Sequence, residues 1–187
     1  MTLPPNYVQA MELLGQVCLE YRRACGGDRA WLVGGASVVI LTDGAFHSGD
    51  FDLVASNETV FREILVKHGF QDEKGQGRAG SVLHVGWMHP NHPDLGWQLV
   101  TGPLFDGRSD KSRGIALELK PDSELTLPAW EDLIADRLSQ FAAQDGKSHH
   151  ELVEQARLLF RLASEIDHDY LKRRVTEDGG DLSLLFG

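Results

Sequence analysis

The sequence contains few cysteines and no long apolar run. Cys18 and Cys25 are its two cysteines, and no metal-ligand pattern surrounds them, so a reducing, cytoplasmic setting is expected. The eight histidines form no zinc-binding motif. No apolar stretch approaches the roughly 20 residues of a membrane span, so no membrane partner is expected. Residues 1–15 lack a basic start followed by an apolar block, and a secretory signal is not expected either.

Basic residues are also scarce. The chain has 18 Lys and Arg against 28 Asp and Glu, which gives a formal net charge of −10. Broad nucleic-acid binding depends on basic side chains that neutralise phosphates, so no extended nucleic-acid surface is expected. Two small basic clusters, Lys111 with Arg113 and residues 172–174, are interpreted as solvated surface.

What is present is the patterning of a soluble α/β protein. With 187 residues, of which 42% are apolar and 25% charged, the chain fits one domain or one domain with an appendage. Helical periodicity covers the N-terminus and the last third, and short apolar runs fill the middle. We expect an α/β (α+β) domain over residues 1–125, with an N-terminal helix at 5–25 and a mixed sheet with flanking helices. A helical C-terminal region over 126–187 is expected to pack on it.

The expected helices carry start and stop signals. Asn57 is placed to cap a helix that stops at Gly69, and Pro128 stands at the start of another. The tail 176–187 shows no period and is expected to be loosely ordered. Helices are predicted at 6–25, 36–41, 57–69, 128–144, 148–166 and 167–175, and strands at 30–33, 50–54, 81–88, 96–102 and 114–120.

Two aspartates stand one residue apart in a predicted strand, "DFDLV". Residues i and i+2 of a strand project from one face, so Asp50 and Asp52 point together while Phe51 faces the other side. Neighbouring carboxylates repel unless a cation lies between them, and Mg²⁺ prefers hard oxygen ligands of this kind. The alternative is that both aspartates lie on the solvated face of an edge strand.

A glycine pair, Gly34-Gly35, comes between a predicted strand and a predicted helix. Without side chains there, backbone N–H groups at the helix N-terminus can approach a triphosphate, and Ser37 can add a hydroxyl. The alternative is a tight turn without a ligand. The pattern is not a Walker loop, because no Gly-Lys-Ser/Thr follows, and its spacing does not fit a dinucleotide fingerprint.

The order strand, Gly-Gly, helix, strand with Asp-x-Asp resembles the nucleotidyltransferase superfamily that includes DNA polymerase beta. The matching stretch is "VGGASVVILTDGAFHSGDFDLV", with a spacer of fourteen residues between Gly35 and Asp50, which is somewhat long for the superfamily. The resemblance implies that Gly34, Gly35 and Ser37 hold the nucleotide phosphates. It implies that Asp50 and Asp52 are catalytic and bind Mg²⁺, or Mn²⁺ in its place.

The stretch "LPAWEDLIADRLSQFAAQ" suggests a narrower kinship. It is similar to a helix of small bacterial nucleotidyltransferase-like proteins related to abortive-infection and toxin–antitoxin systems. Arg137 occupies the place where a Lys commonly stands in those proteins. The resemblance implies nucleotide binding by Arg137, and the alternative is an ion pair with Asp132 or Asp136.

The sequence departs from the superfamily at the third carboxylate. A later strand usually supplies this metal ligand or general base, and in "LGWQLVTG" the position holds Gln98. An amide coordinates a metal weakly and cannot take a proton at neutral pH. Glu118 and Asp94 are possible substitutes, although a structural role is the simpler interpretation of each.

Two functions therefore stay open from the sequence. The first is Mg²⁺-dependent transfer of a nucleoside monophosphate from an NTP to a hydroxyl or phosphate acceptor on RNA, protein or a small molecule. The second is a catalytically degenerate nucleotide-binding or protein-interaction module of a toxin–antitoxin system, which Gln98 and the acidic composition favour.

Overall fold

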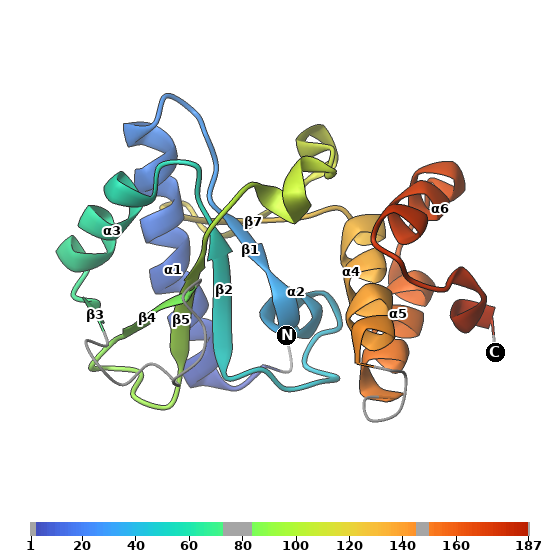
Figure 1. Ribbon diagram of the computed structural model, residues 1–187. Coiled ribbons are helices and arrows are strands. Elements are labelled where there is room, and N and C mark those ends of the chain that lie inside the picture. Colours follow the sequence, from blue (N-terminus) through green and yellow to red (C-terminus); the bar gives the residue numbers. More distant parts are fainter. Residues whose placement is uncertain (1–2, 73–83, 145–149, 187) are drawn as a thin grey trace.

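The computed structural model of the chain describes residues 3–72, 84–144 and 150–186 (Figure 1). Six α-helices lie in these ranges: α1 (Pro5–Ala24), α2 (Gly34–Leu41), α3 (Glu58–Lys67), α4 (Trp130–Ala143), α5 (His150–Leu162) and α6 (His168–Glu177). The strands in these ranges are β1 (Trp31–Val33), β2 (Asp50–Val54), β3 (Gln71–Asp72), β4 (His84–Met88), β5 (Gly96–Val100), β6 (Ile115–Lys120) and β7 (Ser123–Leu127). Short 3₁₀ helices span Leu104–Gly107, Lys111–Arg113 and Leu182–Phe186.

The main sheet is mixed. Its five strands run in the order β1-β2-β5-β4-β3, and β6 pairs with β7 in a separate two-stranded sheet. Strands β2 and β5 are parallel, and the other neighbours in the main sheet are antiparallel. The predicted fold class, a mixed α/β sheet with flanking helices and a helical C-terminal region, is confirmed.

One face of the main sheet forms the larger core. Phe51 and Leu53 of β2, with Trp97 and Leu99 of β5, are buried in one apolar cluster with residues of α1 and α3. Tyr7 of α1 lies on Phe51, with ring centroids 4.9 Å apart. Figure 1 shows α1 and α3 on this side of the sheet and α4 to α6 on the other. Because strand side chains alternate, Asp50 and Asp52 project from the opposite face, toward the C-terminal helices.

The C-terminal helices have a core of their own, and α2 joins it. Val38 of α2 is buried with Leu133, Leu138, Leu159 and Val175 from the three C-terminal helices. The expected boundary at residue 125 falls inside β7, whose residues 125 and 127 belong to the larger core. The helix that follows the Gly-Gly turn therefore connects the two parts of the molecule.

Several predicted elements agree with the structure, but the strands β3 and β7 were not predicted, and the expectation for the C-terminal tail differs from the structure. Asn57 caps α3 by accepting a hydrogen bond from the Val60 N–H at 3.2 Å. The strand β7 was not predicted, and it pairs with β6 after the turn at Pro121-Asp122. The expectation of a loosely ordered tail is wrong, because Leu185 in the last 3₁₀ helix is buried against the C-terminal helices. Residues 81–83 of the strand predicted at 81–88 lie outside the described residues.

No helix in the described ranges combines the length and the apolar character that crossing a membrane requires.

Candidate active site

The Gly-Gly turn and the Asp-x-Asp strand are in direct contact. Val33 pairs with Asp52 in the β1–β2 register, and α2 begins at the next residue, Gly34. Gly34 has φ +70°, a left-handed conformation that disfavours other residues. A Cβ at this position would lie 2.4 Å from Oδ2 of Asp52. The sequence therefore needs glycine here for two reasons, and the Asp52 carboxylate lies against the first residue of α2.

Asp50 also lies over a glycine. It is exposed, and it pairs with Gly96 of β5. A Cβ on Gly96 would lie 2.4 Å from Oδ1 of Asp50. Asp50 thus leans toward β5, and Asp52 leans toward Gly34. The sequence alone does not mark Gly96 as a site residue, because its role depends on strand pairing with Asp50, which lies 46 positions earlier in the chain.

Gln98 stands beside Asp52. The parallel register of β2 and β5 pairs the two residues, so their side chains project from the same face of the sheet. The amide therefore occupies the strand position nearest to Asp52 on this side. Of the two possible substitutes for a third acid, Glu118 lies in the separate β6–β7 sheet and Asp94 lies exposed in the β4–β5 loop.

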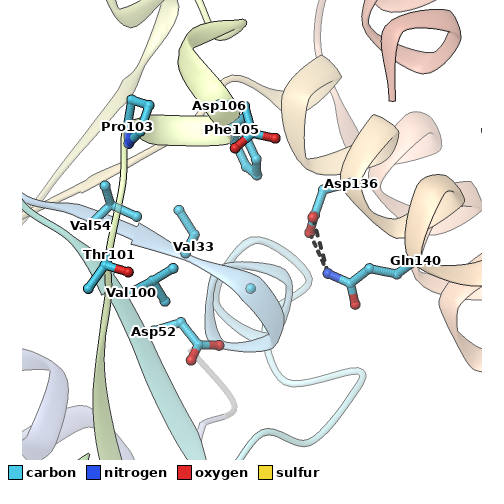
Figure 2. Close-up of a pocket in the computed structure, with 11 residues that line it drawn as sticks. Val33, Asp52, Val54, Val100, Thr101, Pro103, Phe105, Asp106, Asp136 and Gln140 are labelled. Carbon is cyan, nitrogen blue, oxygen red and sulfur yellow. Dashed lines mark hydrogen bonds between the residues drawn. The ribbon is translucent and has the colours of Figure 1, made fainter. Parts of the chain in front are cut away.

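A cleft of about 300 Å³ opens between this face of the sheet and α4 (Figure 2). Three carboxylates line it, from β2, from the segment after β5 and from α4. The lining residues are Val33, Gly34, Asp52, Val54, Val100, Thr101, Pro103, Phe105, Asp106, Asp136 and Gln140.

The α4 side of the cleft is built around Asp136. Its carboxylate accepts hydrogen bonds from Nε2 of Gln140, 3.1 Å from each oxygen, and forms an ion pair with Arg137. Arg137 is buried, and its Nη1 also donates to Gln155 at 3.5 Å. Of the alternatives weighed for Arg137, the structure contains the ion pair with Asp136. Nucleotide binding by Arg137 stays a prediction.

Ser37 faces the interior of the turn. Its side chain is fully buried, and its hydroxyl donates to the backbone carbonyl of Leu32 at 2.7 Å. This hydrogen bond ties α2 to β1 from inside. A phosphate contact by Ser37 would require the hydroxyl to leave that carbonyl, whereas the Gly34 backbone already lines the cleft.

The segment after β5 was missed by the sequence analysis. Phe105 and Asp106 line the cleft, with consecutive left-handed backbone conformations at φ 45° and 55°. Non-glycine residues rarely adopt this conformation, and Gly107 continues it at φ 79°. The available signal was the Asp106-Gly107 dipeptide, which marks a turn without indicating that the turn faces a site.

The aspartates fit a divalent metal only together with a ligand. In the described part of the chain, no three His, Cys, Asp or Glu side chains lie close enough to hold an ion by themselves. Asp50 and Asp52 supply hard oxygen donors at an open face beside a helix N-terminus. Mg²⁺ commonly takes one or two carboxylates and completes its coordination with water and substrate phosphates, so the donor set suits it.

Solved nucleotidyltransferase structures share this fold. A comparison with protein-family models and one with curated proteins both found no match. The crystal structure of ANT(2'')-Ia in complex with adenylyl-2''-tobramycin aligns with a TM-score of 0.59 at 12% identity, over 91% of this chain and 97% of that chain. A solution structure of the antibiotic-resistance factor ANT(2'')-Ia aligns with a TM-score of 0.57 at 10% sequence identity, over 90% of each chain. The crystal structure of an antigenic nucleotidyltransferase-like protein from Paracoccidioides brasiliensis aligns with a TM-score of 0.58 at 14% sequence identity, over 89% of this chain and 86% of that chain.

These alignments extend over about nine-tenths of the chain, and at such low identity they bear on the fold alone. The predicted toxin–antitoxin link stays a prediction. The strand order, the contact between the Gly-Gly turn and the Asp-x-Asp strand, and the three alignments agree: this chain has the nucleotidyltransferase fold, as the resemblance in its sequence indicated.

Proposed function

We propose that this protein is a Mg²⁺-dependent nucleotidyltransferase that moves a nucleoside monophosphate from an NTP to a hydroxyl of a small molecule. The contact between Asp52 and Gly34 is the observation that supports it. The Asp52 carboxylate lies against Gly34, the first residue of α2, and both line the cleft. A metal ligand therefore lies next to backbone N–H groups of a helix N-terminus, which are suited to phosphate.

The chemistry follows from the proposed roles of these groups. The N-terminus of α2 at Gly34-Gly35 binds the phosphates, and Asp50 and Asp52 hold the metal. The metal supplies charge neutralisation on the phosphates when it is bound. The acceptor oxygen attacks the α-phosphorus, the bond from that phosphorus to the bridging oxygen breaks, and pyrophosphate leaves. The hydroxyl proton passes to solvent water in the open cleft, since Gln98 cannot accept it and the Asp136 carboxylate is already paired with Arg137.

The acceptor is proposed to be a small alcohol that carries amino groups. A cleft of about 300 Å³ suits a small molecule. Its Asp106 and Asp136 carboxylates offer oxygens that accept from an ammonium group, although each also has an arginine partner, Arg108 at 3.5 Å and Arg137 respectively. ANT(2'')-Ia, which shares the fold, has been solved with adenylyl-2''-tobramycin, the product of nucleotidyl transfer to a small molecule.

Incubation with each labelled NTP tests the proposal. The reactions contain Mg²⁺ or Mn²⁺ and one acceptor class: amino alcohols and amino sugars, neutral sugars, RNA, or protein. We expect label on an amine-bearing alcohol, with loss of transfer in EDTA and in the Asp50→Ala/Asp52→Ala variant. Transfer that persists in that variant, or no transfer to any class, would overturn the proposal.

A second candidate is a nucleotide-binding module without transfer. The pairing of Gln98 with Asp52 favours it, because an amide replaces the third carboxylate at that position. Calorimetry distinguishes the two candidates. Mg²⁺-dependent NTP binding to the wild type, lost in the Asp50→Ala/Asp52→Ala variant and without transfer to any acceptor, would support the module.

A further inference from the structure

The segment Phe105–Asp110, here called the wall segment, connects the cleft to the C-terminal helices. Phe105 and Asp106 at its start line the cleft on the side opposite Asp52 (Figure 2). Their left-handed backbones are unfavourable for residues with side chains, so other contacts must hold the segment in place.

Those contacts come from α4 and α6. The Arg108 guanidinium donates to the Glu177 carbonyl at 3.1 Å and to the Asp178 carboxylate at 2.6 Å. Ser109 donates its hydroxyl to Asp132 at 2.6 Å. The backbone N–H of Asp110 donates to the Tyr170 hydroxyl at 2.9 Å.

A buried ion pair stands behind these anchors. Asp132 and Arg174 are both fully buried, and Nε of Arg174 donates to Asp132 at 2.6 Å. Tyr170 donates its hydroxyl to the same carboxylate at 2.9 Å. The Arg174 guanidinium carbon also lies 5.9 Å from the centre of the Phe105 ring. The wall segment is therefore attached to a fully hydrogen-bonded group inside the helical region.

We propose that the wall segment determines acceptor specificity. In this proposal Phe105 and Asp106 are the specificity-determining residues, and Arg108 and Tyr170 are positioning residues. Tyr170 acts through the backbone of the segment, and Arg108 acts both by anchoring the segment and through its own ion pair with Asp106 at 3.5 Å. The inference rests on the proposed function, since it assigns the acceptor side of the same cleft. Among the described residues, α6 contributes none to the cleft lining. The proposal nevertheless gives this helix a role in substrate selection, because it anchors the wall segment.

Arg108→Ala tests the positioning role against a matched control. Arg157 on α5 likewise donates to one backbone carbonyl, that of Leu184 at 2.7 Å, and to a carboxylate, that of Glu154 at 2.9 Å, but it lies outside the wall segment. Arg108 differs from it by a second, weaker carboxylate partner, Asp106 at 3.5 Å. We expect Arg108→Ala to raise the acceptor KM about tenfold, the size of one lost charge-assisted anchor, with the NTP KM unchanged. Arg157→Ala should change neither KM, and Arg108→Lys should recover part of the loss.

Asp106→Asn tests the specificity role. Asn keeps the shape of the side chain and tolerates the left-handed backbone, but it carries no charge. We expect the KM for an amine-bearing acceptor to rise and the KM for a neutral alcohol to stay the same, with Tm unchanged. Equal effects on charged and neutral acceptors would overturn the assignment of Asp106.

Two readouts separate this inference from the proposed function. If the wild type transfers a nucleotide and the Arg108→Ala and Arg157→Ala variants have equal acceptor KM values, the inference alone is wrong. Amide hydrogen exchange over residues 104–110 needs no activity. Faster exchange in Arg108→Ala than in Arg157→Ala supports the anchoring even if no acceptor reacts, and equal exchange overturns it.

Discussion

Two aspartates in this molecule, Asp52 in the cleft and Asp132 in the helical region, show how differently one residue type is used. Asp132 is fully buried and accepts hydrogen bonds from Ser109, Tyr170 and Arg174. Asp52 is half-buried, and a glycine leaves room for its carboxylate at the edge of an open cleft. Burial and the identity of the neighbours, rather than residue type, separate a structural carboxylate from one able to meet a ligand.

The electrostatics around Asp132 reinforce the contrast. Burial raises the pKa of the Tyr170 hydroxyl, and its hydrogen bond from the Asp110 N–H only partly offsets this. Burial by itself lowers the pKa of Arg174, but hydrogen bonds to Asp132 and Asp178 outweigh it, so the pKa of Arg174 is raised overall. Both groups keep their protons at neutral pH, and the buried group therefore acts as a fixed structural unit.

The largest expected effect is on activity, at Asp52. Asp52→Asn keeps the shape and removes the negative charge that a metal requires. We expect nucleotidyl transfer to fall by about 10³-fold or more, equivalent to about 4 kcal/mol of transition-state stabilisation. The free energy of unfolding should change by less than about 1 kcal/mol, because the side chain is only half-buried. A labelled-NTP assay and urea unfolding measure the two quantities.

The matching substitution Asp132→Asn should act mainly on stability. It leaves the buried Arg174 without its closest carboxylate, and breaking such a pair costs about 3 kcal/mol or more. Urea unfolding measures the loss, and Lys172→Ala is the control, because the Lys172 side chain is exposed on α6. If Asp132→Asn left stability unchanged and abolished transfer, the contrast between the two aspartates would be wrong.

Two glycines with similar backbones allow a sharper comparison. Gly34 and Gly26 have φ +70° and +64°, but a Cβ on Gly26 would meet nothing within 4 Å. Each substitution to Ala should destabilise the fold by about 1–2 kcal/mol through the backbone. Only Gly34→Ala should also displace Asp52 and abolish transfer. Equal activity of the two variants, compared at equal folded fraction by circular dichroism, would remove the support for the Gly34–Asp52 contact.

The smallest expected effect is at Gln98. Gln98→Glu would add a third carboxylate beside Asp52, and we expect transfer to rise by only a few-fold at neutral pH. This is less than the roughly 10²–10⁴-fold contribution of a well-placed general base, because the added charge also repels Asp52. Gln9→Glu, at an exposed position of α1, carries the same charge change away from the cleft. A loss of transfer would show that the amide is required where it stands, and no response would show that a third carboxylate at this position takes no part in transfer.

Local patterns in the sequence were sufficient to predict β2 and the start of α3. The alternation in "DFDLV" gives the strand at Asp50–Val54, and Asn57 caps the helix that follows. The apolar runs on either side of the glycine pair likewise predict a strand before it and a helix after it, as in β1 and α2. These features depend on neighbours within a few residues, where backbone conformation and strand period act directly.

The opposite side of the cleft could not be predicted in this way. Asp106 and Asp136 come to it from segments that lie far from β2 in the sequence, and each looks like an ordinary turn or helix residue by itself. Arg137 shows the same limit: it pairs with Asp136, whereas Asp132 pairs with Arg174 of α6, and no local pattern distinguishes these partners. Such choices are settled by packing between helices, which leaves no local pattern.

The sequence by itself determined one half of the site: two carboxylates on one strand face and a glycine turn before a helix, since strand period and glycine's backbone freedom are local properties. Only the tertiary structure decided that Asp52 lies against Gly34, that Gln98 on β5 is its neighbour, and that Asp106 and Asp136 line the far side of the cleft. Register and interhelical packing bring those groups together, and both depend on the burial of apolar faces across the whole chain.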